Sequence, residues 1–465
     1  MLSFGTDGWR AEIADEFTFA NLRLVTRAVA DYLKSTTAEP SVIVGYDNRF
    51  MGAEFAAAVA ETMAACGVLA IVGDRAYPTP VVAYAVREFK ADGAVMLTAS
   101  HNPYFYNGFK FIPEYAGPAT SEITARIERN IAALAGGAPP PRAEDHAGVK
   151  VEPLDTGYRN HVLGFVDLAR LKAADLAVGL DPYYGAGLIL LPALARSAGL
   201  AVTVLHDTVD PFFGGTLPDP SEKNLAELKS LVIGEGLDLG LALDGDADRF
   251  GVITGDGRYL TPNQIVALLL MHMVKNRGAR GAVVRTVATT HLIDTVAAKY
   301  GVEVVETPVG FKYVGAVMRR QPVIIGGEES GGLSVLGHIP EKDGLLANLL
   351  VAEMVAMEGK SLADIWAGLQ AEFGEYFNTR LDIHYPLEKK NALLKSLTSA
   401  PPQRVGSLRV RQVNRTDGVK LLLEADAWLL IRPSGTEPLI RAYIEAKSAA
   451  TLVNLEEAVR EMLSA

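Results

Sequence analysis

The chain is poor in two residue classes whose scarcity limits what it can do. It has a single cysteine, Cys66, among 465 residues, so an internal disulfide is excluded. Cys66 lies in the helical-looking stretch that begins at Glu54, and we interpret it as a small buried hydrophobe. Basic residues are outnumbered, because 44 Lys and Arg against 55 Asp and Glu give a formal net charge of −11. This charge argues against nucleic acid as the main partner, since no basic face is implied.

Long apolar runs are also missing. The longest, around residues 265–274, contains His272 and is too short to cross a bilayer. The first residues show no basic-then-apolar targeting signal, so we expect a cytoplasmic protein with no membrane partner. The hydrophobic fraction of 49% is that of a globular protein, and the length predicts about three domains.

What the chain does have is an acidic loop directly after an apolar run, residues 239–243. Three carboxylates alternate there with small residues: Asp244, Asp246 and Asp248. Their crowding is costly unless a cation neutralises it, and oxygen ligands favour a hard divalent ion, Mg²⁺ first. An EF-hand would need Gly at its sixth position and Glu at its twelfth, where the chain has Arg249 and Gly255. A solvated acidic turn stays open as the alternative, although the position after a strand favours a metal site.

A second loop presents a hydroxyl group. Ser100 follows the apolar run 95–97, and Asn102-Pro103 forces a turn beyond it, so Ser100 is placed at a strand end. Its hydroxyl could be a nucleophile or carry a phosphate, and the alternative is a serine that only caps a turn or a helix. Lys110 could bring a cation beside Ser100, or be solvated like most lysines.

Two further loops carry weaker signals. Residues 326–332, after the apolar run 323–325, combine glycines, which let a ligand approach the backbone, with Glu and Ser, which hydrogen-bond hydroxyls. Near the C-terminus, residues 432–438 combine Arg, hydroxyls and Gly, and Arg441 follows, a composition that suits a phosphate. Taken alone, each loop is also consistent with an ordinary turn.

The four loops, in this order, resemble the signature of the α-D-phosphohexomutase superfamily. The matching segments are residues 98–103, 244–249, 327–332 and 432–438, and residues 4–10 match the family's opening motif. Strands and helices alternate in three units, which predicts mixed α/β units with a largely parallel sheet. The resemblance implies three related mixed α/β domains plus a smaller C-terminal α+β domain around a central cleft. We expect these domains at residues 1–150 (phosphoserine loop), 151–255 (metal loop), 256–372 (sugar-recognition loop) and 373–465 (phosphate-binding loop).

The resemblance also implies a mechanism and a set of site residues. Ser100 carries a phosphoryl group, and its phosphate holds Mg²⁺ together with Asp244, Asp246 and Asp248. Arg10, His101 and Lys110 surround the phosphoserine, with Lys110 serving proton transfer or charge relief. The implied substrate-binding residues are Arg249, Lys312, Glu328, Ser330, His338, Lys342, Arg432, Ser434, Gly435, Thr436 and Arg441.

Substrate choice depends on a departure from one branch of the family. Mannose-type and glucosamine-type members commonly end the third loop with Gly-His, whereas this chain has Gly331-Gly332, and residues 337–344 resemble phosphoglucomutases. The resemblance therefore implies interconversion of hexose 1-phosphate and 6-phosphate through a 1,6-bisphosphate, with glucose first and mannose second. Glucose 1,6-bisphosphate is the implied activator, and we expect a monomer or homodimer. Alternatives are a phosphoglucosamine mutase, a Mg²⁺-dependent sugar-phosphate phosphatase with Asp244 as nucleophile, and an idle sugar-phosphate binding protein.

Overall fold

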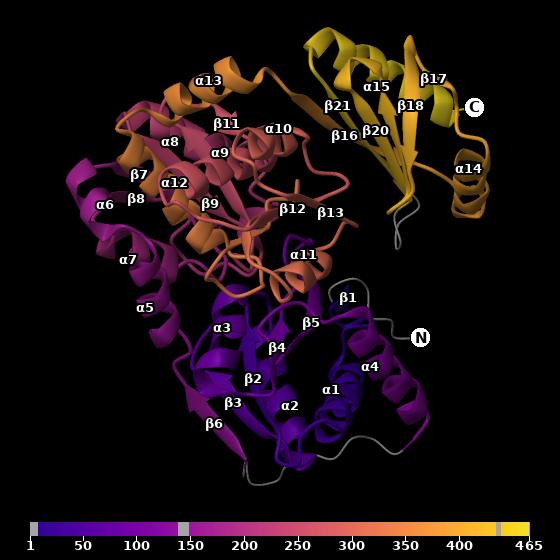
Figure 1. The fold of residues 1–465 in the computed structure, drawn as a ribbon. Coiled ribbons are helices and arrows are strands. Elements are labelled where there is room, and N and C mark those ends of the chain that lie inside the picture. Colours follow the sequence, from indigo (N-terminus) through magenta and orange to yellow (C-terminus); the bar gives the residue numbers. More distant parts are fainter. Residues whose placement is uncertain (1–7, 138–147, 434–438, 465) are drawn as a thin grey trace.

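The structure is a computed structural model that describes residues 8–137, 148–433 and 439–464. It confirms the expected fold class, because three α/β domains are followed by a C-terminal domain that combines an antiparallel sheet with helices. Figure 1 shows the first domain at the bottom, the second and third above it, and the C-terminal domain at the upper right. None of the described helices is long and apolar enough to cross a membrane.

The first domain is built on a six-stranded sheet in the order β1-β5-β4-β2-β3-β6. Strands β2, β3, β4 and β6 are parallel, and β1 and β5 run antiparallel at one edge. The strands are β1 (Trp9–Glu12), β2 (Ser41–Tyr46), β3 (Leu69–Gly73), β4 (Gly93–Leu97), β5 (Tyr106–Pro113) and β6 (Val149–Glu152). The helices are α1 (Phe19–Lys34), α2 (Gly52–Ala65), α3 (Thr79–Phe89) and α4 (Ser121–Leu134).

The second domain has a five-stranded sheet in the order β11-β10-β9-β7-β8. Its strands are β7 (Ala177–Asp181), β8 (Ala201–Val204), β9 (Leu239–Leu243), β10 (Phe250–Thr254) and β11 (Tyr259–Leu260). Its helices are α5 (Thr156–Phe165), α6 (Leu168–Ala174), α7 (Leu190–Ser197) and α8 (Ala226–Glu235), with a 3-10 turn at Phe213–Gly215. The first two sheets thus end at residues 152 and 260, slightly beyond the boundaries expected at 150 and 255.

The third domain has a four-stranded sheet in the order β13-β12-β14-β15. Its strands are β12 (Ala282–Thr286), β13 (Val304–Thr307), β14 (Val323–Gly327) and β15 (Leu333–Val335). Its helices are α9 (Pro262–Lys275), α10 (Leu292–Lys299), α11 (Phe311–Met318), α12 (Gly344–Glu358) and α13 (Leu362–Phe373). Helix α9 begins at Pro262, because Thr261 and Gln264 form a capping box there and proline suits the first helical position.

The three α/β domains share one arrangement of strand, loop and returning strand. In each, a buried strand that lies parallel to a neighbour ends in a loop, and the chain returns antiparallel beside that strand. The strand pairs are β4 with β5, β9 with β10, and β14 with β15, and the loops between them are residues 98–105, 244–249 and 328–332. The fold therefore presents the three central sequence motifs at equivalent positions of three sheets.

The C-terminal domain is an antiparallel sheet in the order β16-β21-β20-β19-β18-β17 with two helices. The strands are β16 (Phe377–His384), β17 (Arg404–Val405), β18 (Leu408–Asn414), β19 (Val419–Leu423), β20 (Trp428–Pro433) and β21 (Leu439–Ala446). The helices are α14 (Leu387–Ser399) and α15 (Ala449–Ser464), and a 3-10 turn covers Glu424–Asp426.

One core runs through the first three domains, whereas the C-terminal domain has its own. Helix α12 belongs to the shared core, and all of residues 344–355 are buried. The Asn348 side chain donates to the carbonyl of Ala242 at 3.0 Å. A Cβ at Gly344 would lie 2.3 Å from the carbonyl oxygen of Arg249, so only glycine allows this approach to the metal loop.

A buried carboxylate joins the third domain to the C-terminal domain. Glu445 on β21 has no exposed surface, and both of its oxygens accept hydrogen bonds. Its donors are Trp428 Nε1 at 2.7 Å, Asn378 Nδ2 at 2.6 Å, the backbone N–H of His291 at 3.0 Å, and Thr290 Oγ1. We call Glu445 and these four donors the Glu445 junction.

Candidate active site

Ser100 follows β4 in a loop that is held by a buried arginine. The backbone of Ser100 is left-handed, with φ of 51°, which is uncommon for a residue other than glycine and is kept only where surroundings enforce it. Arg49 provides that enforcement. Its guanidinium donates to the carbonyl oxygens of Ser100, Asn102, Pro103 and Tyr106 at 2.7, 2.7, 2.7 and 3.0 Å.

Arg49 is itself held by Asp47, a residue directly beyond β2. The two side chains are buried and approach to 3.2 Å, and Asp47 also accepts from the hydroxyl of Thr98. Burial raises the pKa of Asp47 to about 6 against the opposing effect of Arg49. Sequence reasoning missed this pair, although Asp47 follows a strand parallel to the one before Ser100, and parallel strands end at the same edge.

The hydroxyl of Ser100 reaches the acidic loop of the second domain. Ser100 Oγ donates to Asp244 Oδ2 at 3.0 Å. We call Asp244, Asp246 and Asp248 the aspartate cage: all three are fully buried, and one carboxylate oxygen from each lies within 4.8 Å of the others. Burial raises the pKa of Asp244 well above its usual range, and the charges of the other two carboxylates raise it further.

Two lysines and one threonine face the other members of the cage. Lys110 Nζ donates to Asp246 at 2.9 Å and to Asp248 at 3.1 Å, and Lys342 Nζ lies 2.8 Å from Asp248. The Thr79 hydroxyl, at the start of α3, donates to Asp246 at 2.6 Å. Burial alone would raise the pKa of Asp246, but the two ammonium groups outweigh it and bring the pKa below the usual range. The pKa of Asp248 is lowered in the same way, against burial and Asp246.

The cage fits a hard divalent cation. Within the described part of the chain, Asp246 Oδ1 and Asp248 Oδ1 are buried and have no hydrogen-bond partner. Two such oxygens, together with Asp244 and the hydroxyl of Ser100, form an all-oxygen donor set of the kind that Mg²⁺ prefers. Four residues are therefore the candidates to hold a metal: Ser100, Asp244, Asp246 and Asp248.

His101 and Arg10 flank the serine. His101 Nδ1 lies 3.5 Å from Ser100 Oγ, and Arg10 donates to the side chain of Asn102 at 2.8 Å. The positive charge of Arg249 and then burial hold the pKa of His101 well below its ordinary value. The imidazole is therefore neutral near pH 7.

The third loop joins the metal loop through its backbone. Arg249 and Gly332 form an antiparallel bridge, and Glu328 Oε1 accepts from the backbone N–H of Gly310 at 2.9 Å. Burial, followed by the nearby Glu329, raises the pKa of Glu328 to about 7. Ser330, partly exposed, lies in the same loop. The sugar-recognition loop, with Glu328 and Ser330, therefore lies next to the aspartate cage.

The two described arginines that are predicted to bind the second phosphate lie on paired strands of the C-terminal domain. Arg432 on β20 is opposite Arg441 on β21, and they face Asp417 at 2.9 Å and Asp382 at 3.8 Å, respectively. Burial raises the pKa of Glu329 in the third loop, and the positive charge of Arg432 opposes that rise. The other predicted residues of the phosphate-binding loop, Ser434, Gly435 and Thr436, lie outside the described residues.

Two predicted residues are placed apart from this group. Lys312 Nζ donates to Ser121 of the first domain at 3.2 Å. His338 lies 2.9 Å from Asp343 and 2.9 Å from the imidazole of His161. Among the described residues, no contact joins the His338 side chain to Ser100, the aspartate cage or Glu328.

Four family models cover most of the chain. They describe the phosphoglucomutase/phosphomannomutase α/β/α domains I, II and III, at residues 1–136, 156–257 and 261–373, and the C-terminal domain, at residues 393–462. The chain is 30% identical to a phosphoglucomutase/phosphomannomutase of Thermococcus kodakarensis, over 99% of this chain and 96% of that protein. It is 32% identical to a protein of Methanobrevibacter smithii named "Probable phosphoglucosamine mutase", over 98% and 96%.

Solved structures show the same likeness. A crystal structure from Thermus thermophilus, described as a phosphomannomutase, superposes with a TM-score of 0.88 at 32% identity. The match covers 100% of this chain and 99% of that one. Sequence and structure comparisons therefore agree over the full length.

Proposed function

The chain belongs to the phosphoglucomutase/phosphomannomutase family of the α-D-phosphohexomutase superfamily, and from that premise we propose that it interconverts glucose 1-phosphate and glucose 6-phosphate. Members of this superfamily are isomerases that act as intramolecular phosphotransferases, and this chain is one of them. Mannose phosphate is the proposed second substrate. The proposed intermediate, and activator, is the hexose 1,6-bisphosphate.

One observation carries the proposal. Ser100 Oγ lies 3.0 Å from Asp244 at the rim of a buried cage in which two carboxylate oxygens have no hydrogen-bond partner among the described residues. A serine in that position is suited to carry a phosphoryl group, and the cage is suited to hold the Mg²⁺ on which the family depends. The bound ion supplies neutralisation of the charge on the transferring phosphoryl group.

The chain's own residues handle charge and protons. In the forward step, the bond from phosphorus to Ser100 Oγ breaks, a bond to the free sugar hydroxyl forms, and the hydroxyl proton must leave. Neutral His101, 3.5 Å from Ser100 Oγ, is our proposed acceptor. Lys110, which contacts two carboxylates, acts as an ammonium that relieves charge. The second half-reaction returns the other phosphate to Ser100 by the same steps in reverse.

Substrate binding is assigned to the loops around the cage. Glu328 and Ser330 read the sugar hydroxyls, and the phosphate far from Ser100 is held by Arg432, Arg441, Ser434, Gly435 and Thr436. Further phosphate contacts are proposed for Arg10, Arg249 and Lys342, whereas Lys312 is left out because its ammonium group donates to Ser121 of the first domain. His338 is left out of this assignment, because its imidazole contacts Asp343 and His161 instead.

The low rank that we propose for glucosamine phosphate rests on the third loop. A Cβ at Gly332 would lie 2.4 Å from the Cδ of Lys342, so the lysine side chain fills the place that a residue 332 side chain would take. Lys342 in turn reaches Asp248 at 2.8 Å. A sugar with a 2-amino group would add a cation beside this ammonium, so we rank glucosamine phosphate below glucose and mannose phosphates.

The test replaces the proposed carrier. Ser100→Ala should lower conversion of glucose 1-phosphate, with catalytic glucose 1,6-bisphosphate present, by about 10³-fold or more. Ser230→Ala, which removes an exposed hydroxyl on α8, is the matched control and should keep full activity. Intact-mass analysis should find a phosphate adduct in wild type and in the control, and none in the Ser100 variant. Normal turnover by Ser100→Ala, or release of inorganic phosphate as the main product, would overturn the proposal.

A further inference from the structure

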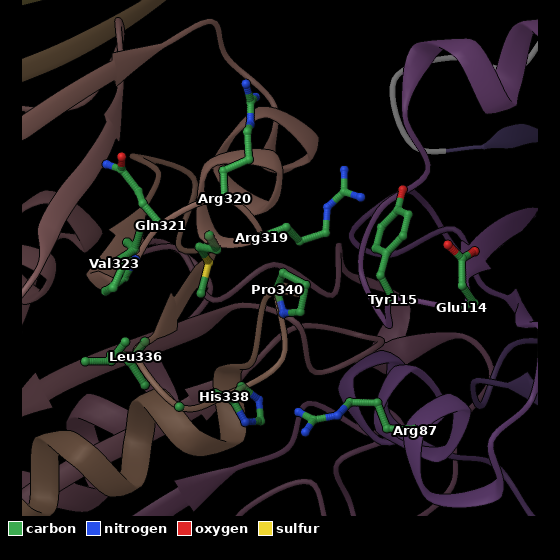
Figure 2. Close-up of a pocket in the computed structure, with 14 residues that line it drawn as sticks. Arg87, Glu114, Tyr115, Arg319, Arg320, Gln321, Val323, Leu336, His338 and Pro340 are labelled. Atoms are coloured by element: carbon green, nitrogen blue, oxygen red, sulfur yellow. The ribbon is translucent and has the colours of Figure 1, made fainter.

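A second hollow lies on the seam between the first and third domains (Figure 2). It is lined by the end of α3 and the loop after β5 on one side, and by the end of α11, the start of β14 and the loop after β15 on the other. Its volume of about 580 Å³ is in the range of small-molecule sites. The mutase mechanism makes no use of it.

The lining of this pocket is basic in a chain that is acidic overall. It includes Arg87, Arg319, Arg320 and His338, and Glu114 is the one carboxylate among its described lining residues. The whole chain has a formal charge of −11, so a pocket lined by four basic side chains differs in charge from the chain as a whole. Figure 2 shows Arg87 reaching toward His338 on one side of Pro340 and Arg319 reaching toward Tyr115 on the other.

The arginines of the pocket have guanidinium N–H groups that could donate to a ligand. Among the described residues, neither Arg87 nor Arg319 forms a hydrogen bond or an ion pair through its guanidinium. Each lies against an aromatic ring instead, Arg87 at 5.9 Å from the centroid of Tyr84 and Arg319 at 3.7 Å from that of Tyr115. Arg320 donates from Nε to the carbonyl oxygen of Ala316 in the preceding helix. Its two terminal guanidinium nitrogens form no hydrogen bond with the described residues. Arg87, Arg319 and Arg320 are exposed, and guanidinium groups beside aromatic rings that present N–H donors to solvent are suited to phosphate oxygens.

The pocket is separate from the proposed active site but linked to it by two rigid elements. Helix α3 begins at Thr79, which contacts Asp246, and reaches Arg87 about 12 Å later. Strand β14 begins at Val323, in the pocket, and ends about 13 Å away, just before Glu328. The pocket and the active site therefore lie at opposite ends of the same helix and the same strand.

We propose that this pocket is an anion site that takes a small phosphorylated metabolite with two or more negative charges, held between Arg87 of the first domain and Arg319 and Arg320 of the third. Cations on both sides of the seam favour an occupant that carries more than one anionic group. Such an occupant ties the two domains together at the far ends of α3 and β14. This proposal does not depend on the substrate of the mutase reaction.

The test uses inorganic pyrophosphate as the probe, in EDTA so that metal-bound pyrophosphate does not contribute. Equilibrium dialysis of the full chain should find two sites, one in the pocket and one at Arg432 and Arg441. The double variant Arg87→Ala/Arg319→Ala should lose one site, or weaken it roughly tenfold or more, because it removes charge-assisted hydrogen bonds. Its mutase activity without pyrophosphate should equal that of wild type, which also shows that it folds.

Two further variants make the result specific. Arg126→Ala/Arg129→Ala removes the same charge from exposed positions of α4, where Arg126 lies 5.5 Å from the ring of Tyr32, and should keep both sites. Arg432→Ala/Arg441→Ala should keep the pocket site and lose the other. The proposal is overturned if Arg87→Ala/Arg319→Ala binds as wild type does, or if wild type has a single site that the Arg432→Ala/Arg441→Ala variant abolishes.

Discussion

The aspartate cage and the Glu445 junction both remove carboxylates from solvent, and they satisfy those carboxylates differently. At the junction, one glutamate accepts four hydrogen bonds, two on each oxygen. In the cage, Asp246 and Asp248 share two lysines and one threonine, and Asp244 accepts from the Ser100 hydroxyl and the backbone N–H of Arg249. Two carboxylate oxygens of the cage have no hydrogen-bond partner in the described structure. Burial is common to both, so burial does not mark a site. The difference is that the cage has acceptors left for a ligand.

The largest expected effect comes from changing the charge of the cage while keeping its shape. Asp246→Asn should lower turnover by about 10³-fold, because it weakens the cation site and breaks the contact with Lys110. Excess Mg²⁺ or Mn²⁺ should restore part of the loss, and the free energy of unfolding should change little. Steady-state kinetics at several Mg²⁺ concentrations and chemical denaturation measure the two effects. Asp238→Asn, which changes an exposed carboxylate bonded to a backbone N–H, is the control. Full activity of Asp246→Asn after EDTA treatment would make the cage structural.

The junction should respond in the opposite way. Glu445→Ala leaves four donors without an acceptor and should cost about 3 kcal/mol or more of unfolding free energy. Because the C-terminal domain has its own core, we expect its unfolding to separate into an earlier transition. Denaturation followed by tryptophan fluorescence reports this, since Trp428 lies at the junction. Glu457→Ala on the exposed face of α15 is the control. If Glu445→Ala instead abolishes phosphorylation of Ser100 in a folded protein, the contrast between the two clusters fails.

The active site should also make the unfolding free energy depend on pH. The pKa of Glu328 is raised to about 7, so between its ordinary pKa of about 4.5 and pH 7 the folded state binds more protons than the unfolded state. The unfolding free energy should therefore fall as the pH rises through that window, by about 3 kcal/mol from this group. Glu328→Gln should flatten the dependence. Denaturation in EDTA at pH 4.5 to 7 measures it, and an unchanged slope in the variant would assign the dependence to other groups.

The smallest effect tests the substrate ranking. Gly332→His should push Lys342 away from Asp248 and lower kcat/KM for glucose 1-phosphate by roughly tenfold. Mannose 1-phosphate should be affected less. Gly234→His, at a position with open space around its Cα, is the control. Side-by-side kinetics on glucose, mannose and glucosamine 1-phosphates decide the matter. A wild-type preference for glucosamine phosphate would change the substrate but not the mutase class.

The sequence was informative where chemistry and chain position coincide. The motifs at Ser100, Asp244 and Glu328 each follow an apolar strand, and the structure brings the first two into hydrogen-bond contact. The alternation of strands and helices predicted the fold class. Contacts between distant residues were not predictable, because no local pattern encodes them. Arg49 holds a loop that lies 51 to 57 residues further along the chain.

Two other features needed the fold. His338 was assigned to the substrate from the motif around it, but the loop after β15 carries it to the opposite end of β14, beside Arg87. Its polar partner His161 comes from α5, 177 positions away. Likewise, the Glu445 junction joins groups from three strands and one loop of two domains, none of which stands out in composition.

The burial of α12 has a consequence for how the chain is made on the ribosome. Residues 344–355 fill the core shared by the first three domains, yet they are synthesised after most of the apolar surface that they cover. Until α12 emerges, the growing chain must carry that surface exposed, which is the condition under which chaperones are engaged. We expect ribosome-bound chains arrested before residue 344 to be cut readily by added protease. Chains arrested well beyond residue 373 should resist it, whether or not the C-terminal domain has been synthesised.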